Sequence, residues 1–431
     1  GPTGSAAAPW RAGTDLSGLF THVVVADREV DGETVSVEAH GDLAAMFYGL
    51  ENVTSVDLTH LEITDRTTDV SAMFSGMTKV SSIGTGEPTA AGASVPGITL
   101  PASMDTSGVV RAAGMFSGMT ALRTADFSGL TDAGGFMNAD GADLSQMFEG
   151  SFAQGASLAL EDFGNGDGAD MTRLAAKGQT SAGEIGGGLA SVRMENSASG
   201  DAAKLTAAFR GNARLKTAVF AGVGAGAGAD LTYMLEACGT EVAKAEAFAA
   251  GAQTVTWSFA DAGVGGGADF SHLATGALTG DVGSGSKIEF LLSDDTKPAV
   301  PASVEGMLSG GLHISAVDLR GLAGVAGSAA QWMCGLSGPT SLVQSESAVE
   351  NAVTLREGFS FSGVTSLNAA FSEMATLERA SLADVCATDG DLAHAFADDP
   401  ALTEVALATS AADGMPAGSA TDMTGMFSGC K

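Results

Sequence analysis

One pattern of polar and apolar positions recurs along the whole chain. A small polar residue, most often Asp, precedes an apolar residue, and a bulky pair such as Met-Phe follows four and five places after the polar one. Clear copies begin at Asp15, Asp42, Asp69, Asp143 and Asp422. Self-similarity at a period of roughly 20 to 50 residues indicates a stacked repeat array.

The apolar positions also predict the elements within each repeat. Counted from the polar residue as position zero, apolar residues recur at positions 11, 14 and 16, as in Val53, Val56 and Leu58 after Asp42. Alternation of this kind predicts a short strand with one face inward and residues such as Asp57 outward. A polar residue at position zero is typical of a helix N-cap, and the bulky pair one turn later would fill the interior. Each repeat is therefore predicted as strand, turn, short helical segment and turn.

The polar position is filled in the same way along most of the chain, with Arg111 and Lys204 as exceptions. Asp, Ser or Thr stands at positions 15, 42, 69, 143, 170, 230, 254, 269, 303, 328, 366, 391 and 422. Thr254 is a doubtful copy because Asp269 follows it too soon. We expect residues 1–14 to be a cloning remnant and lead-in, and residues 15–431 to form one solenoid of 14 or 15 repeats, truncated in the last.

The longer intervals between repeats contain stretches rich in Gly, Ser, Ala and Pro. We expect these stretches to be loop insertions extruded from one edge of the stack. They lie near 84–97, 178–188, 277–287 and 339–352.

The charge balance narrows the classes of partner. The chain has 20 Lys and Arg against 51 Asp and Glu, for a net charge of −31. Such a surface repels nucleic acid and anionic membranes over roughly 8–10 Å at ordinary salt. No apolar stretch is long enough for a membrane-spanning helix. We therefore expect a basic or neutral partner, no nucleic acid and no membrane-spanning segment.

The cysteines and histidines do not form a recognisable reactive set. Cys238, Cys334, Cys386 and Cys430 lack metal-type spacing, and we expect buried free thiols. Six histidines are scattered one to a repeat, at positions 22, 40, 60, 272, 313 and 394, and no Ser, Cys or carboxylate recurs with them. Neither a catalytic triad nor a metal site is indicated.

Two glycine-rich motifs resemble ligand-binding sites, but a purely structural role explains each of them as well. Gly-x-Gly-Ala-Asp at 166–170, 226–230 and 265–269 resembles calcium-binding nonapeptides, but those sites need copies in immediate succession. The segment 222–227, with Glu246 further on, resembles a dinucleotide fingerprint without the crossover helix that such a site requires. In both motifs a glycine-permitted turn before a capped segment explains the same residues.

Nearly the whole chain is similar to the BspA-like leucine-rich repeats of bacterial surface proteins, with the weakest likeness at residues 150–300, where Ala and Gly replace large apolar residues. The resemblance rests on apolar-Asp-Leu strands and Met-Phe-x-Gly ends, and is strongest at residues 42–130 and 420–430. The matching phrases include Val56-Asp57-Leu58-Thr59, Met73-Phe74-Ser75-Gly76, Met115-Phe116-Ser117-Gly118 and Met426-Phe427-Ser428-Gly429-Cys430. The resemblance implies a right-handed solenoid displayed on a cell surface and used for adhesion, and it carries over no ligand residue.

Together these observations predict an α/β repeat fold: an elongated right-handed leucine-rich-repeat-like solenoid with a short parallel strand and a short helical segment per rung. The expected function is an extracellular, cell-surface adhesin or display module that binds a host or bacterial surface protein or glycan. A passive stalk without its own ligand is the first alternative, and an enzyme the second. We expect a monomer without cofactor, metal or catalytic residues, and the ligand-binding residues are unknown.

Overall fold

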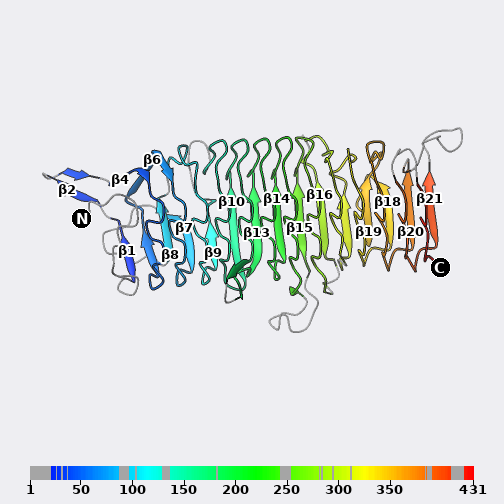
Figure 1. Cartoon of the computed structure of the whole chain (residues 1–431), viewed down its shortest axis with the longest axis horizontal. Helices are drawn as coiled ribbons and strands as arrows, with labels where there is room; N and C mark the ends of the chain where they lie inside the picture. Colours follow the sequence, from blue (N-terminus) through cyan, green and yellow to red (C-terminus); the bar gives the residue numbers. More distant parts are fainter. Residues whose placement is uncertain are drawn as a thin grey trace. The chain divides into compact units, whose positions relative to one another are not determined.

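The computed structural model describes most of the chain (Figure 1). The described residues are 21–25, 27–30, 33–35, 37–86, 97–101, 104–128, 136–180, 183–242, 254–280, 282, 285–293, 296–310, 313–383, 385, 391–408 and 422–431. The expected repeat at Asp15, the lead-in at 1–14, Glu246 and Cys386 lie outside them. The chain divides into two compact units, Gly1–Asn212 and Ala213–Lys431.

The first unit is built on one parallel sheet with three small two-stranded sheets beside it. The order across the parallel sheet is β1 (His22–Val24), β5 (Ser55–Asp57), β8 (Gly97–Pro101), β7 (Ser82–Gly86), β9 (Thr124–Asp126), β10 (Ala156–Glu161) and β13 (Leu189–Glu195). The small sheets are the antiparallel pair β2 (Arg28–Val30) and β3 (Glu33–Val35), the parallel pair β4 (Val37–Asp42) and β6 (Leu61–Asp69), and the antiparallel pair β11 (Gly178–Thr180) and β12 (Gly183–Ile185).

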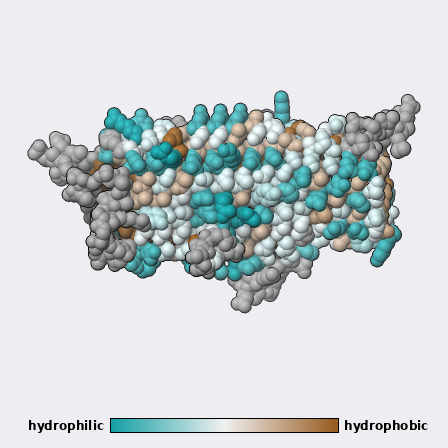
Figure 2. Space-filling model, viewed as in Figure 1, coloured by the Kyte–Doolittle hydropathy of each residue, from teal (hydrophilic) through white to brown (hydrophobic). Residues whose placement is uncertain are grey.

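The second unit has the same plan without the small sheets. Its parallel strands follow the order β14 (Thr217–Ala221), β15 (Thr256–Ala260), β16 (Lys287–Leu291), β17 (Ala316–Leu319), β19 (Ala352–Arg356), β18 (Ser341–Ser345), β20 (Arg379–Ala383) and β21 (Glu404–Ala408). The prediction of short parallel strands in a repeat stack is confirmed. On the strand face seen in Figure 2, hydrophilic and neutral residues predominate.

The strand register follows the sequence pattern closely. Nine strands begin thirteen residues after a position-zero residue: β5, β7, β9, β10, β14, β17, β18, β20 and β21. Inward residues such as Val56 and Phe220 are fully buried. The pattern of positions 14 and 16 therefore located most strands correctly.

The predicted helical segment was wrong, because each rung carries a run of turns in its place. No α-helix occurs in the part of the chain that the structure describes. In the rung that begins at Asp69, the N–H groups of Val70, Ala72 and Phe74 donate to carbonyls of the following rung at 2.8, 2.9 and 2.8 Å. An α-helix would direct these groups to carbonyls four residues back in the same segment. The turn runs instead tie successive rungs to one another.

Backbone dihedrals explain why a helix cannot form there. The residue at position 3 has a positive φ in every described rung, for example Ala45 at 55° and Ala72 at 52°. Position 7 is a glycine with positive φ in many rungs, including Gly49, Gly76 and Gly118. A right-handed helix requires negative φ at every residue, so alternation of sign excludes it.

The position-zero side chain accepts a hydrogen bond from the backbone N–H two residues later, as a cap would, although no helix follows it in the described rungs. Asp69 Oδ1 accepts a hydrogen bond from Ser71 N–H at 2.9 Å, and the same bond recurs from Thr172 to Asp170. The two exceptions have a defined role, because position-zero residues of neighbouring rungs lie side by side. Arg111 Nε lies 2.6 Å from Asp69 Oδ2, and Lys204 Nζ lies 3.5 Å from Asp170 Oδ2. Each cation thus interrupts a column of stacked carboxylates.

The interior is filled by columns of identical positions. Phe74 stacks between Phe47 and Phe116, with ring centroids 5.5 and 5.3 Å apart. In the second unit, Phe259 stacks between Phe220 and Phe290 at 5.0 and 4.4 Å. The bulky pairs and inward strand residues are therefore core, as expected.

All four of the expected loop insertions include strand residues. Segment 339–352 contains β18 and the first residue of β19, so the expectation of an extruded loop there was wrong. Segment 84–97 overlaps the end of β7 and the start of β8, and its residues 87–96 lie outside the described part. Segment 178–188 holds the hairpin of β11 and β12, and 277–287 leads into β16.

The extra strands β8 and β19 interrupt the order of the sheet. Each follows the regular strand of its own repeat in the chain, yet lies on the side of the preceding repeat. On the turn side no extra rung is present, since Ala329 N–H donates directly to Ser366 O at 2.9 Å. At this point the sheet therefore contains one more strand than there are turn runs on the other side of the stack.

Candidate functional site

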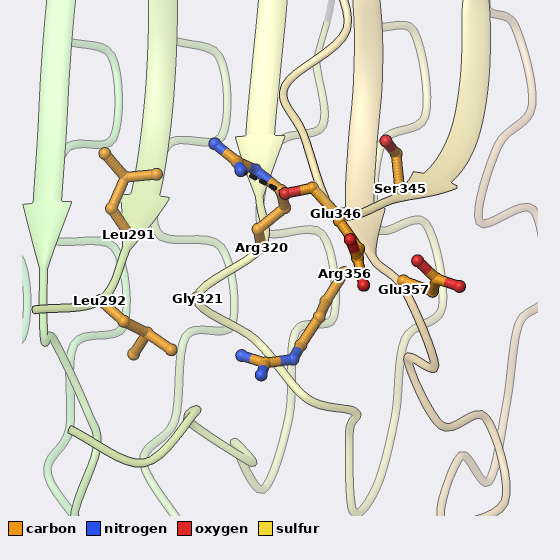
Figure 3. Close-up of a pocket in the computed structure, with 8 residues that line it drawn as sticks. All are labelled: Leu291, Leu292, Arg320, Gly321, Ser345, Glu346, Arg356 and Glu357. Carbon is orange, nitrogen blue, oxygen red and sulfur yellow. Dashed lines mark hydrogen bonds between the residues drawn. The ribbon is translucent and has the colours of Figure 1, made fainter. Parts of the chain in front are cut away.

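The second unit has a groove where the inserted strand disturbs its sheet. Its volume is about 620 Å³, and it lies at the carboxyl ends of β16, β17, β18 and β19 (Figure 3). The residues that line it are Leu291, Leu292, Arg320, Gly321, Ser345, Glu346, Arg356 and Glu357.

The groove follows from how β18 is joined to β19. The two strands are parallel and adjacent, with Ser341 opposite Ala352, so residues 346–351 must return the chain to the start of the next strand. Six extended residues span about 20 Å, which is little more than the length of the strand itself. The connection therefore runs straight back along the sheet.

Burial of Thr354 shows on which face the connection runs. Its neighbours Val353 and Leu355 point into the core and are fully buried, so Thr354 points outward. Thr354 is nevertheless only 1% exposed, and its Oγ1 accepts a hydrogen bond from Val349 N–H at 3.1 Å. The returning segment thus crosses the outer face and forms a raised wall beside the ends of β16 and β17.

Two arginines stand side by side at this wall. Leu319 of β17 pairs with Leu355 of β19. Arg320 directly follows Leu319, and Arg356 directly follows Leu355. Arg356 in turn lies opposite Ser345 of β18. In a chain with only 20 basic residues, adjacent arginines on neighbouring strands are a local reversal of the acidic balance.

Arg320 is committed to the structure of the wall. Its guanidinium donates to both carboxylate oxygens of Asp318, with Nη2 2.7 Å from Oδ2, and Nη1 donates to the carbonyl of Glu346 at 2.7 Å. The hydrogen bond to Asp318 raises the pKa of Arg320 above its ordinary value, while burial opposes this. Arg320 therefore anchors the returning segment to β17.

The guanidinium of Arg356 has no comparable contacts within the described part of the protein. Among the residues that the structure describes, its guanidinium has no ion pair and no hydrogen-bond acceptor. Figure 3 shows the side chain extending from β19 toward the side where Leu292 lies, with Glu346 and Glu357 on the other side. The carboxylates of Glu346 and Glu357 are exposed and likewise unpaired within the described residues. Three charged groups are thus available to a ligand.

The structure gives the glycine-rich motifs local roles in the backbone. Asp167 N–H donates to Asp140 Oδ1 at 3.0 Å, and Asp201 N–H donates to Asp167 Oδ1 at 2.9 Å. These carboxylates therefore cap neighbouring rungs. No group of three or more His, Cys, Asp or Glu within the described ranges could hold a metal ion. Residues 222–227 follow β14 and lead into the turn run at Asp230, so the helix of a dinucleotide site does not follow them.

The histidines and cysteines lie in separate rungs with separate neighbours. Hydrogen bonds join His22 to Ser55, His60 to Asp27, His272 to Thr275 and His313 to Ser337, and His272 also stacks on Tyr233. Cys238 is buried and forms no disulfide, as expected, whereas Cys334 and Cys430 also form no disulfide but are only half-buried. The structure does not bring these residues together.

Sequence reasoning did not find the groove residues. The available signal was a basic residue at the carboxyl end of each of two strands, Arg320 and Arg356, in a strongly acidic chain. Their adjacency depends on the inserted strand β19, and the expected loop at 339–352 covered β18 and the first residue of β19.

Comparisons of this chain with protein-family models, with curated proteins and with solved structures found no match. The described residues include no helix that is long and apolar enough to cross a membrane.

Proposed function

We propose that this chain is a recognition module of the adhesin type: a repeat stack that displays a ligand groove at the carboxyl ends of β16 to β19. As part of the same proposal, the module works outside the cell, attached to a bacterial surface, and binds a host or bacterial surface molecule. The similarity to BspA-like repeats supports the location. The unpaired Arg356 in a formed groove carries the proposal of binding.

The supporting physical argument is pre-organisation. The pairing of Leu319 with Leu355 fixes the backbone beside Arg356, and Arg320 holds the returning segment in place through Asp318 and Glu346. A groove whose walls are already ordered loses little conformational entropy when a ligand binds. Surface groups that are already unpaired also have no internal ion pair to break.

Binding to intact cells tests the proposal against a passive stalk. Beads that carry the purified chain would be titrated against epithelial cells and against bacterial cells, and bound beads counted by flow cytometry. We expect saturable binding to one cell type. The variant Arg356→Gln/Glu346→Gln/Glu357→Gln should lose most of this binding.

The matched control changes charges outside the groove. Arg379 and Glu404 are exposed and lie opposite each other on β20 and β21. Arg379→Gln/Glu404→Gln should bind like the parent chain. Absence of saturable binding to either cell type would favour the stalk, and equal loss in both variants would move the site away from the groove.

A further inference from the structure

The groove presents charges of both signs that do not neutralise each other. Arg356 contributes one cation, and Glu346 and Glu357 contribute two anions, without an ion pair among them. Arg320 adds no available charge, because Asp318 already holds it. Leu291 and Leu292 give the opposite side an apolar, half-buried surface.

From this arrangement we propose that the groove binds an extended peptide segment of a partner protein, one that carries a carboxylate close to a basic side chain. The inference rests on the proposed function and specifies its ligand. Arg356 pairs with the carboxylate, Glu346 and Glu357 attract the basic side chain, and an aliphatic side chain packs on Leu291 and Leu292. A guanidinium matches a carboxylate with two parallel hydrogen bonds, which makes the first contact directional.

The balance of charge favours such a peptide over an acidic glycan. A net charge of −31 and two free carboxylates in the groove repel a polyanion, whereas a segment with both signs retains one attractive partner for each group. No aromatic ring is among the residues that line the groove, so the face of a sugar has no flat surface to stack on. Apolar and mixed-charge contacts together are the chemistry of a peptide.

An array of random heptapeptides, probed with the fluorescently labelled full chain at physiological salt, tests this inference. We expect sequences that have Lys or Arg within three residues of Asp or Glu to be enriched at least threefold among the bound peptides. A second array of sialylated and sulfated glycans provides the comparison.

Substitutions of opposite charge sign separate the two halves of the contact. Arg356→Gln should abolish the enrichment in acidic residues while the enrichment in basic residues persists. Glu346→Gln/Glu357→Gln should have the opposite effect. Arg379→Gln, on the exposed side of β20, should leave both enrichments unchanged.

Each outcome bears on one of the two proposals. Arg356-dependent binding to glycans without peptide enrichment would overturn the peptide inference and leave the recognition module standing. Peptide enrichment that is unchanged by substitution of all three groove residues would show that the peptides do not bind in the groove. Failure on both arrays together with failure to bind cells would overturn the proposed function itself.

Discussion

Asp399 accepts a hydrogen bond from the backbone N–H of Met374 at 2.7 Å, while its second carboxyl oxygen is buried without a partner. Two residues at the equivalent position of other rungs show what is missing. Ser151 Oγ accepts from Met119 N–H and donates to the carbonyl of Phe116 at 2.7 Å, and Asn212 Nδ2 donates to the carbonyl of Phe209 at 2.7 Å. The position therefore suits a group that accepts and donates, and a protonated carboxyl does both.

This geometry predicts that the rung of Asp399 loosens as pH rises. Burial raises the pKa of Asp399 to about 7; the Met374 N–H opposes this shift, whereas the charges of Asp398 and Glu373 add to it. A raised carboxyl pKa means that the folded state holds the proton more tightly than the unfolded state. The stabilisation is full below about pH 4 and is lost between pH 4 and 7, on the order of 4 kcal/mol in total.

Hydrogen exchange of the amides in residues 391–399, followed by mass spectrometry from pH 5 to 8 and corrected for intrinsic exchange, measures this change. Asp399→Asn keeps a donor and an acceptor, as Asn212 does, and should remove most of the pH dependence of this rung. Identical pH profiles for the parent and the Asn variant would show that Asp399 is not the responsible group.

A second prediction tests the turn runs against the helix that the sequence pattern favoured. Ala45 has a φ of 55°, whereas its neighbour Ala44 is not among the residues with positive φ. Ala45→Gly should stabilise the rung by up to about 1 kcal/mol, because glycine adopts this conformation without strain. Ala44→Gly should destabilise it by about 0.5–1 kcal/mol through the lost backbone entropy. Denaturant unfolding of the two variants side by side measures the difference, and a similar loss for both would point to a helix.

The strands could be predicted from sequence because their alternation has a single explanation. Val56 and Leu58 must face one side of a strand, and this fixes the register of every similar repeat. The turn runs could not be separated from helices so easily. Apolar residues one, four, five and eight places after Asp69 suit one face of a helix, and they equally suit turns that hydrogen-bond to the next rung. The glycines at position 7, such as Gly76 and Gly118, were the available clue.

The groove could not be predicted from the sequence for a different reason. β18 begins in regular register, but Pro339 and Gln344 replace the apolar residues that mark positions 11 and 16 elsewhere. Gln344 is accommodated through hydrogen bonds to Ala383 N–H at 2.7 Å and to the carbonyl of Phe359 at 3.2 Å. These are contacts between distant residues, and a local pattern cannot reveal them. Arg320 and Arg356 are adjacent because β19 lies between β17 and β18, and this order could not be inferred without recognising β18 as the regular strand of its repeat.

The aromatic column gives a third prediction. Phe74 is fully buried and stacks on Phe47 and Phe116. Phe74→Ala should cost about 3–5 kcal/mol because the neighbouring rungs are tied by backbone hydrogen bonds and cannot collapse into the cavity. Phe74→Leu, which keeps most of the volume, should cost clearly less. Urea unfolding monitored by circular dichroism compares them, and a loss below 1 kcal/mol for the Ala variant would show that the column is not tightly packed.

The last prediction concerns the pairing of Asp69 with Arg111 in the column of position-zero residues. Burial raises the pKa of Asp69, but hydrogen bonds from Ser71 and Arg111 outweigh it, so the pKa of this carboxyl lies below its ordinary value. A lowered carboxyl pKa contributes stability that is present above about pH 4 and is lost as pH falls through the folded-state value.

Two substitutions separate the turn hydrogen bond from the ion pair. Asp69→Ala removes both and should cost about 1–2 kcal/mol at pH 7. Asp69→Asn retains an acceptor for Ser71 N–H and loses only the charge, so its cost should be smaller and should decrease as pH falls through the folded-state pKa of Asp69. Urea unfolding at pH 7 and pH 3 measures both variants. If Asn were as costly as Ala at pH 7, the contact with Arg111 and not the turn would dominate, and position zero would act mainly through charge.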